Sequence, residues 1–382
     1  MDKFIRRDAS VLGRWWWTVD HWLLWAVLML VAIGIVLSVS ASPCVATKIG
    51  ASRYFFVKRH LLMVPLALGT MLCVSLLSPS NIRKLATIIF LIGILAMVCV
   101  LLWGQEIKGS KRWLSLFGVS IQPSEFVKSS LLVIVAWLLW ERQMDAHFRG
   151  IRVATILIVT VAALNICQPD IGMAFVTIAS ATVQIFIAGM PLAWAIGSVF
   201  GVTTCCAFAY MFIPHVTQRI DSFFRPEIGD ADQLYQVRQS LEAFHHGGWF
   251  GCGPGEGIIK RLVPDAHSDF VFSVAGEEYG IFLCIFIVLL FAFIVIRSLL
   301  AVINSQDIFA MFAVTGLSVQ FGLQAFVNMS TAVKLAPTKG MTLPFISYGG
   351  SSMIAIGFSV GIILALTRRK HGFSGEASAY VK

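Results

Sequence analysis

The sequence predicts an all-α membrane protein, a polytopic helical bundle with about ten transmembrane helices. Of the 382 residues, 58% are hydrophobic and only 13% are charged, and the mean hydropathy is +0.83. A soluble domain is about half apolar and about a quarter charged, so this composition excludes that class. Apolar runs long enough to cross the hydrocarbon core, about 30 Å, recur along the chain, and the alternating pattern of a barrel strand is absent.

The apolar runs follow one another along the whole chain. At about 1.5 Å per residue, about 20 apolar residues cross the membrane as a helix. The runs cover residues 21–41, 55–77, 85–103, 124–141, 152–167, 171–189, 191–213, 270–297, 308–331 and 346–366. We therefore expect one membrane domain over residues 1–382.

Aromatic and basic residues near the chain ends predict the orientation. Trp15, Trp16 and Trp17 precede the first span as an interfacial aromatic belt. Basic residues flank the first and the last span: Lys3, Arg6, Arg7, Arg14, Arg368, Arg369 and Lys370. Lys and Arg are retained on the cytoplasmic side, so both termini are predicted to be cytoplasmic, in agreement with an even number of spans.

The net charge and the cysteines exclude several classes. The formal charge is +9, but the basic residues lie mostly at the ends of apolar runs, where orientation and contact with membrane lipids account for them. Nucleic acid is therefore not an expected partner. The eight cysteines fall mostly inside apolar runs and form no CxxC pair, so the sequence indicates neither a zinc site nor a redox motif.

The one long connection, residues 214–268, is expected to be an extracytoplasmic loop. Leu234, Val237, Leu241 and Phe244 recur at helical spacing, which predicts an interfacial amphipathic helix that ends at the glycines 247–248. A glycine-rich turn follows at residues 251–257. A dinucleotide site would need a strand before these glycines and a helix after them, and the sequence predicts neither.

Polar residues inside the predicted spans are the most informative feature, because ionisable groups are costly in lipid. Glu125 and Lys128 lie on one face of the fourth span, either as a mutually neutralised structural pair or with the cation open to an internal cavity. Gln320, Gln324 and Asn328 form a polar stripe that must face a groove or another helix.

Two aspartates precede predicted spans. Asp170 follows Gln168 and Pro169, where the simpler interpretation is a helix N-cap. Asp269 opens the eighth span, and the helical spacing places Asp269 and Glu277 on one side, with Glu278 pointing away. Asp269 is either an N-cap or a general base at the outer mouth of a polar face, and the residues alone leave both possibilities open.

Several cations are predicted on the outer side, against the orientation rule: Lys108, Arg112, Arg219 and Lys339. Lys and Arg are the usual protein ligands of phosphate groups. A phosphate-bearing substrate at the outer leaflet would explain this departure.

Taken together, these segments resemble the SEDS family (shape, elongation, division and sporulation proteins; FtsW/RodA/SpoVE). The similarity extends over nearly the whole chain and is closest to the cell-division branch of alphaproteobacteria. It is carried by the blocks Lys108–Trp113, Gln122–Lys128, Gln168–Asp170, Gly251–Gly257, Pro264–Gly280 and Pro337–Ser352. One departure is Ser268, where the family usually has Thr, and the hydroxyl is kept.

The resemblance implies a peptidoglycan glycosyltransferase that polymerises lipid II at the outer face of the cytoplasmic (inner) membrane. Asp269 matches the family's essential acid and would take the proton of the acceptor hydroxyl. Lys108, Arg112, Arg219 and Lys339 would stabilise the leaving pyrophosphate. Glu277 and Lys128 would line the substrate groove. A divalent cation, Mg²⁺ or Mn²⁺, is expected at the pyrophosphate, although no ligand set can be identified; no other cofactor is expected.

The resemblance also implies partners and a place in the cell. These are a class B penicillin-binding protein that acts as septal transpeptidase, other divisome proteins, and the division septum. Two other functions fit outward cations and many spans: a lipid II flippase and a divisome scaffold. Asp269 separates them from the polymerase, because neither alternative has much need of a carboxylate at the outer mouth.

Overall fold

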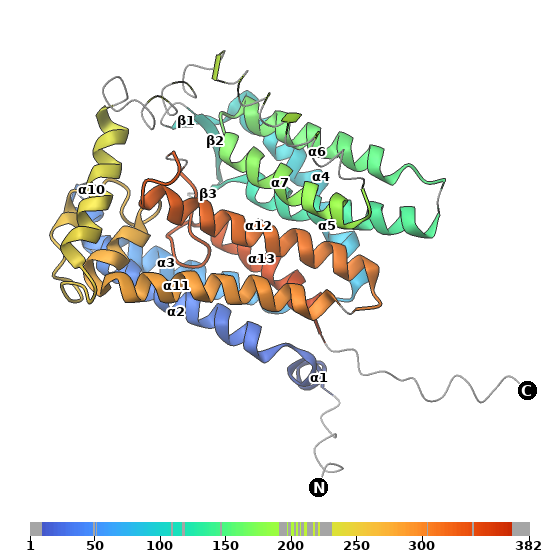
Figure 1. The fold of residues 1–382 in the computed structure, drawn as a ribbon, viewed down its shortest axis with the longest axis horizontal. Coiled ribbons are helices and arrows are strands. Elements are labelled where there is room, and N and C mark those ends of the chain that lie inside the picture. Colours follow the sequence, from blue (N-terminus) through green and yellow to red (C-terminus); the bar gives the residue numbers. More distant parts are fainter. Residues whose placement is uncertain are drawn as a thin grey trace, which may run out of the picture.

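The computed structural model describes residues 10–48, 50, 52–107, 110–116, 119–145, 147–190, 231–303, 305–337 and 340–368, with scattered positions between 197 and 221. Most of its helices run along one long axis, whereas α10 (Ala231–Gly247) stands across it, as Figure 1 shows. Seven are long and apolar enough to cross a membrane: α2 (His21–Lys48), α3 (Phe55–Ser75), α4 (Pro79–Trp103), α5 (Pro123–Met144), α6 (Gly150–Cys167), α11 (Val271–Ile303) and α12 (Ile308–Ala332).

Two shorter apolar helices, α7 (Ile171–Ile187) and α13 (Ser351–Leu366), complete the part of the bundle that the structure describes. Together with the seven long helices they match nine of the ten predicted runs. The remaining run, 191–213, lies almost entirely outside the described residues. The predicted all-α bundle is confirmed.

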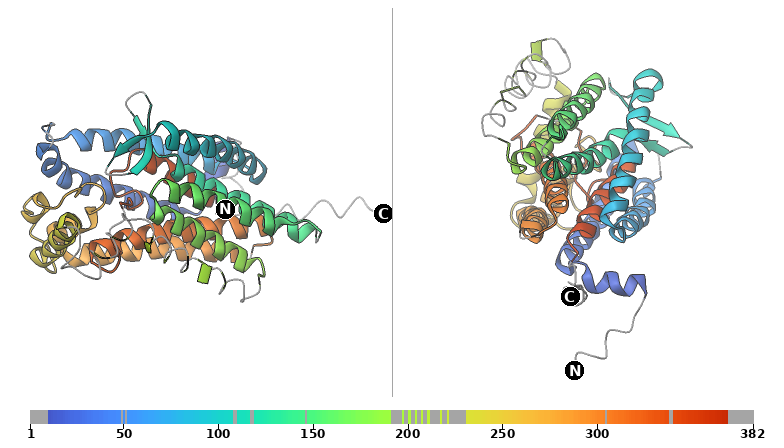
Figure 2. Two further views of the ribbon diagram at one scale, coloured as in Figure 1. Left: turned by 90° about the horizontal axis from the view of Figure 1, so that it is seen from above. Right: turned by 90° about the vertical axis from the view of Figure 1, so that its right-hand side faces the viewer.

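The centre of the bundle is formed by α5, α12 and α13. In the apolar 18-residue stretches of α5 and α12, 78% and 72% of the residues are buried inside the bundle, against 56% or less for the other five long helices. Nearly every residue of α13 is also buried. α13 packs on α3, and α12 packs on α5, α7 and α11. Figure 2, right, views the bundle along its axis, with the helices seen end-on. Polar residues on these central helices therefore face protein and not lipid.

A small antiparallel sheet between α4 and α5 was not predicted from the sequence. It has the order β1 (Gln105–Ile107), β2 (Ser110–Leu116) and β3 (Val119–Ile121), and β2 packs against α4 and α5. The register pairs Gln105 with Trp113 and Leu114 with Ile121. Two of these strands have three residues each, too few for the period of two to stand out from the flanking loops.

The two ends of the bundle are formed by different elements. At one end lie α1 (Val11–Thr18), the start of α2 and the end of α11 (Figure 1), where the Arg297 Nε lies 2.8 Å from the Asp20 Oδ2. The end of α13 joins the end of α3 through Arg368, which donates to the Leu77 carbonyl at 2.8 Å. The described beginning and end of the chain therefore lie at the same end of the bundle.

The opposite end carries α10 (Ala231–Gly247), the glycine turn at 251–257 and the 3₁₀ turn η1 (Ile259–Arg261). The predicted amphipathic helix is present, and it ends at the predicted glycines. It packs against α11, where the rings of Phe244 and Phe272 lie 5.7 Å apart. This end of the molecule holds the acidic and glycine-rich motifs that the sequence singles out.

Candidate functional site

The turn at residues 264–270 positions Asp269 directly before α11. Asp265 has a φ of +50°, and its carbonyl accepts the backbone N–H groups of Ser268 at 3.0 Å and of Asp269 at 3.1 Å. Asp and Asn tolerate this left-handed conformation better than most residues. The turn therefore fixes the backbone of Asp269, whose side chain is only half-buried.

The carboxylate of Asp269 faces the segment that leads into α13. A Cβ atom on Gly340, where φ is +58°, would lie 3.5 Å from the Asp269 Oδ2. Asn328 on α12 joins the two segments, since its Nδ2 donates to the carbonyl of Asp269 at 3.1 Å and to that of Met341 at 2.6 Å. Two motifs about 70 residues apart in the sequence thus meet at this carboxylate.

The residues before Asp269 are held just as tightly. The Ser347 hydroxyl donates to the Ser268 carbonyl at 2.5 Å, and the Tyr348 N–H donates to the His267 carbonyl at 3.0 Å. The rings of His267, Tyr348 and Phe56 contact one another in tilted and edge-to-face arrangements, with centroids 4.1 to 5.6 Å apart. The sequence analysis did not assign these aromatic residues, although two of them lie inside the motif blocks.

Below this turn a polar network connects α5, α12 and α13. The Lys128 Nζ lies 2.5 Å from the Glu125 Oε2 and donates to the Gln324 Oε1 at 2.6 Å. Gln324 donates to the Thr342 carbonyl at 3.1 Å, and the Ser352 hydroxyl donates to Glu125 at 3.2 Å. The predicted stripe on α12 therefore faces other helices.

Lys128 does not reach an open surface. Its side chain is 1% exposed and that of Glu125 is 3% exposed. The structure thus supports the neutralised structural pair and corrects the expected place of Lys128 on the substrate groove. A buried ammonium needs such a partner, because an unpaired charge in this environment costs several kcal/mol.

Arg112 on β2 is also bound by protein groups. Its guanidinium lies 3.5 Å from the Asp170 Oδ2 and donates to the carbonyls of Gln168, at 3.3 Å, and Pro169. Asp170 caps α7 as predicted, since it accepts the Met173 N–H at 3.2 Å. Arg112 is 9% exposed, so it fastens the sheet to the turn between α6 and α7 and is not presented to a ligand.

Glu277 and Glu278 are both buried, which corrects the expectation that Glu277 lines a groove with Asp269. Glu277 is 0% exposed, and its carboxylate accepts the N–H groups of Ile259 and Lys260, each at 2.7 Å. Glu278 forms an ion pair with the Lys260 ammonium. The difference arises because the loop from 251 to 261 folds back over the first turns of α11, which the helical spacing alone does not show.

The Cys252 thiol lies beside Glu277 and His246. Burial raises its pKa, and the carboxylates of Glu277 and Glu278 raise it further. His246, at the end of α10, lies 3.1 Å from the Glu277 Oε1 through its Nδ1. Among the described residues, His246, Cys252 and Glu277 form the group whose ligand atoms are close enough to hold a metal ion.

The three remaining expected cations, Lys108, Arg219 and Lys339, lie outside the described residues. Lys339 directly precedes Gly340 in the sequence. The described part of the site is therefore a half-buried carboxylate in a hydrogen-bonded backbone frame, facing a segment that follows Lys339 in the sequence. Such a half-buried carboxylate, held by its backbone, is suited to accept a proton from a bound hydroxyl group.

Comparison with known proteins agrees with this geometry. The FtsW/RodA/SpoVE family model, described as cell cycle protein, matches residues 21–372. The chain is 40% identical to a probable peptidoglycan glycosyltransferase FtsW from Caulobacter vibrioides, over 99% of this chain and 96% of that protein. It is 34% identical to the protein of the same description from Aliivibrio salmonicida, over 95% of this chain and 94% of that one.

Solved structures show the same fold. A chain of a peptidoglycan synthase complex, studied for the coordination of polymerization and crosslinking, matches with a TM-score of 0.74 and 26% identity, covering 91% of this chain and 97% of that chain. The rod shape determining protein RodA of Thermus thermophilus matches with a TM-score of 0.66 and 26% identity, covering 92% and 97%. The sequence motifs, the bundle and these similarities together show that this multi-pass membrane protein belongs to the FtsW/RodA/SpoVE family of cell cycle proteins.

Proposed function

We propose that this protein is a peptidoglycan glycosyltransferase that polymerises lipid II into glycan strands at the outer face of the cytoplasmic (inner) membrane, for septal cell-wall synthesis. The observation that carries the proposal is the placement of Asp269, half-buried and clamped between the turn before α11 and the segment before α13. The 40% identity to a relative described as a probable peptidoglycan glycosyltransferase supports it.

In the proposed step, the 4-hydroxyl of the acceptor GlcNAc attacks the anomeric carbon of the donor MurNAc. A new C–O bond forms, the bond to the undecaprenyl pyrophosphate breaks, and the pyrophosphate leaves with the bonding electron pair. The hydroxyl proton goes to the carboxylate of Asp269. A sugar hydroxyl is a poor nucleophile at neutral pH, so a positioned base accelerates this attack by about 10²–10⁴-fold.

The leaving group needs cations and no proton, because its charge is stabilised by electrostatic contacts. We assign this role to Lys108, Arg219 and Lys339. Arg112 and Lys128 are taken up by ion pairs with Asp170 and Glu125, so we assign them to the scaffold that holds the site. A divalent ion such as Mg²⁺ or Mn²⁺ is usually held by one or two carboxylates together with substrate phosphates, and we assign no residue of this chain to it. When bound, it would neutralise charge on the pyrophosphate.

The proposal includes partners and a location. The complex formed by the structurally similar peptidoglycan synthase supports a class B penicillin-binding protein, the septal transpeptidase, as the partner that cross-links new strands. We also expect other divisome proteins as partners. Both termini are proposed to lie in the cytoplasm, and residues 214–268 are proposed to lie on the outer side of the membrane. The position of the described chain ends at one end of the bundle, with α10 at the other, supports this orientation.

The experiment that tests the proposal is glycan-strand formation by the purified full chain in detergent, with lipid II as the substrate and with or without the penicillin-binding partner. We expect strands that grow with time and released undecaprenyl pyrophosphate. Lipid II translocation in vesicles without strand formation would instead identify a flippase. Partner binding with neither activity, under conditions in which a related polymerase is active, would identify a scaffold.

A further inference from the structure

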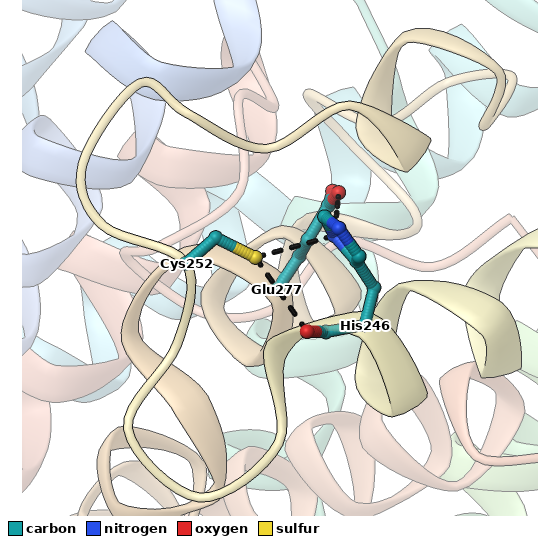
Figure 3. A group of neighbouring side chains, drawn as sticks. All are labelled: His246, Cys252 and Glu277. Carbon is teal, nitrogen blue, oxygen red and sulfur yellow. Dashed lines mark hydrogen bonds and ion pairs between the residues drawn. The ribbon is translucent and has the colours of Figure 1, made fainter.

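Three side chains with metal-binding atoms converge at the end of the bundle that carries α10. Figure 3 shows His246 from the last turn of α10, Cys252 from the glycine turn and Glu277 from α11 pointing toward one another. The His246 Nδ1 lies 3.1 Å from the Glu277 Oε1 and 3.2 Å from the Cys252 Sγ. All three ligand atoms lie within 4.8 Å of one another.

The backbone fixes these positions. The Cys252 N–H donates to the carbonyl of Glu277 itself at 2.9 Å, and the Gly253 N–H donates to the Glu278 carbonyl at 3.0 Å. α10 approaches α11 so closely that a Cβ on Gly247 would lie 2.1 Å from the Gly276 carbonyl oxygen. The three donors are therefore arranged by the fold before any ion binds, which reduces the entropy that binding must overcome.

The carboxylate of Glu277 is also oriented from behind. Its Oε1 accepts the Ile259 N–H and its Oε2 accepts the Lys260 N–H, both at 2.7 Å. Metal sites depend on such outer hydrogen bonds to hold their ligands in the required orientation. The Lys260 ammonium pairs with Glu278, so it leaves the Glu277 charge to the group formed with His246 and Cys252.

The donor set selects the kind of ion. One imidazole nitrogen, one thiol sulfur and one carboxylate oxygen are the ligands that Zn²⁺ takes, whereas Mg²⁺ and Ca²⁺ prefer oxygen. Ligand distances of about 2.0–2.3 Å in a tetrahedron separate neighbouring donors by about 3.4–3.6 Å. The separations from the His246 Nδ1 to the Glu277 Oε1, 3.1 Å, and to the Cys252 Sγ, 3.2 Å, need to open by only a few tenths of an ångström, and the Cys252 Sγ lies within 4.8 Å of the carboxylate. His246 is 39% exposed, so solvent can supply the fourth ligand.

We propose that His246, Cys252 and Glu277 form a binding site for Zn²⁺ that fastens α10 and the glycine turn to α11. Binding releases the thiol proton of Cys252 to solvent, and His246 coordinates through a deprotonated Nδ1. Cys252 follows His246 by 6 residues and Glu277 follows Cys252 by 25, so the site does not match any short cysteine motif that could be recognised in the sequence. The proposal is independent of the polymerase reaction, because its three ligands include neither Asp269 nor any of the cations assigned to the pyrophosphate.

The first test is metal binding by the full chain in detergent, measured with Zn²⁺ against a chromogenic chelator, and with Co²⁺ by absorption spectroscopy. We expect one Zn²⁺ per chain and a thiolate-to-cobalt charge-transfer band. Cys252→Ser should abolish the band, and both Cys252→Ser and His246→Gln should weaken Zn²⁺ binding by at least about 10–100-fold, the loss typical for a metal site's outer partners. Unchanged binding in these two variants would overturn the proposal.

Matched controls are available in the same chain. His245→Gln removes the neighbouring, exposed histidine of α10, and Cys167→Ser removes an exposed cysteine at the end of α6. Both should bind Zn²⁺ as the parent does. A large excess of Mg²⁺ should not displace Zn²⁺, and displacement would overturn the assignment of a nitrogen and sulfur site.

A second measurement reports the structural consequence without any activity assay. Zn²⁺ should slow amide hydrogen exchange in residues 247–261, because it ties this segment to α11, and should raise the thermal midpoint with increasing Zn²⁺ concentration. Both effects should disappear in Cys252→Ser and persist in His245→Gln. Equal effects in the two variants would place the ion elsewhere and overturn the proposal.

Discussion

The side chain of Asp269 is half-buried, unlike four other carboxylates that contact the bundle's polar groups. Glu125, Asp170, Glu277 and Glu278 are each at most 3% exposed, and each lies within ion-pair distance of a basic group. Those four carboxylates hold elements together. A base must reach its substrate, and exposure of Asp269 provides that access.

Asp269→Asn tests this role directly. The substitution keeps the size of the side chain, and the hydrogen bond from the Asn328 side chain goes to the backbone carbonyl of Asp269, which the substitution leaves in place. The helix should therefore form, and binding of lipid II and of the partner should persist. Because the amide cannot accept the proton, we expect strand formation to fall by about 10²–10⁴-fold.

The measurement is the initial rate of polymerisation at saturating lipid II. Glu256→Gln is the matched control, since it neutralises an exposed carboxylate in the glycine turn at the same end of the bundle and should leave the rate unchanged. A near-normal rate for Asp269→Asn would remove this carboxylate from the reaction.

Lys128 offers the opposite case, a cation that we assign to structure. Lys128→Met leaves Glu125 buried without its ion-pair partner, a change that costs about 3–5 kcal/mol. The double variant Glu125→Gln/Lys128→Met should recover much of the loss, because both charges are then gone. Thermal unfolding in detergent measures this. Unchanged stability in Lys128→Met, combined with weaker use of lipid II, would show that the cation serves the substrate.

At the level of single residues, the sequence could identify which polar groups matter but not always what they contact. Helical spacing correctly predicted that Glu125 pairs with Lys128, and turn chemistry correctly predicted the Asp170 cap. Helical spacing placed Glu277 on a groove, and this prediction was wrong because spacing within one helix carries no information about a loop that folds over that helix. That loop covers Glu277 through hydrogen bonds from Ile259 and Lys260, contacts that depend on tertiary structure.

At the level of elements, the contact between the glycine turn and α11 depends on the absence of side chains. Gly280 interrupts α11 with a φ of +79°, and a Cβ there would lie 2.3 Å from the Trp249 carbonyl oxygen. Gly251 makes a similar approach, with the Glu278 carbonyl oxygen 2.2 Å from an added Cβ. The glycines of this turn therefore allow its backbone to pack directly against the backbone of α11.

Two glycines of this turn allow a controlled test of that contact. Gly251 and Gly255 have φ values of +82° and +86°, so alanine strains the backbone at both by about 1–2 kcal/mol. Nothing lies within 4 Å of an added Cβ at Gly255. Gly251→Ala should therefore lower stability further, by about 1–3 kcal/mol, because it forces the turn away from α11.

Thermal unfolding and limited proteolysis of residues 247–261 measure the difference between these variants. The turn of Gly251→Ala should be cut faster than that of Gly255→Ala. Equal stability and equal cleavage would mean that backbone conformation, and not close approach, explains the glycines.

Element prediction succeeded where the signal was long and failed where it was short. The apolar runs predicted the long helices, and the spacing of Leu234, Val237 and Leu241 predicted α10. The sheet β1–β3 was not predicted, because β1 and β3 have only three residues each and their sequence does not differ clearly from that of a loop. Residues 191–213, one of the predicted spans, lie almost entirely outside the described residues, so that span stays a prediction.

At the level of the whole molecule, the fold brings distant motifs to one end of a bundle. Asp269 and the segment from Gly340 to Tyr348 lie about 70 residues apart in the sequence, and hydrogen bonds from Asn328 and Ser347 join them. No local pattern predicts this meeting, because it results from how α11, α12 and α13 pack. The motifs are visible in the sequence and carry the resemblance to a known family, and the packing shows how they are held.

This arrangement predicts the topology of the chain in the membrane. Ser10, before α1, and Glu256, in the glycine turn, belong to opposite ends of the bundle (Figure 1), and both are exposed. If the end with Asp269 faces outward, a cysteine at position 256 should react with a membrane-impermeant maleimide in cells with a permeabilised outer membrane. A cysteine at position 10 should not react.

The measurement uses Glu256→Cys and Ser10→Cys in a chain whose eight native cysteines are replaced by serine or alanine. Disrupting the inner membrane should make both positions reactive, which controls for local burial. The charge distribution gives the physical reason for the expected result, since basic residues that flank the first and last spans are retained on the cytoplasmic side. Labelling of position 10 and protection of position 256 in intact inner membranes would invert the bundle. Asp269 would then face the cytoplasm, where it has no access to outer-leaflet lipid II, and the proposed polymerase reaction would lose its base.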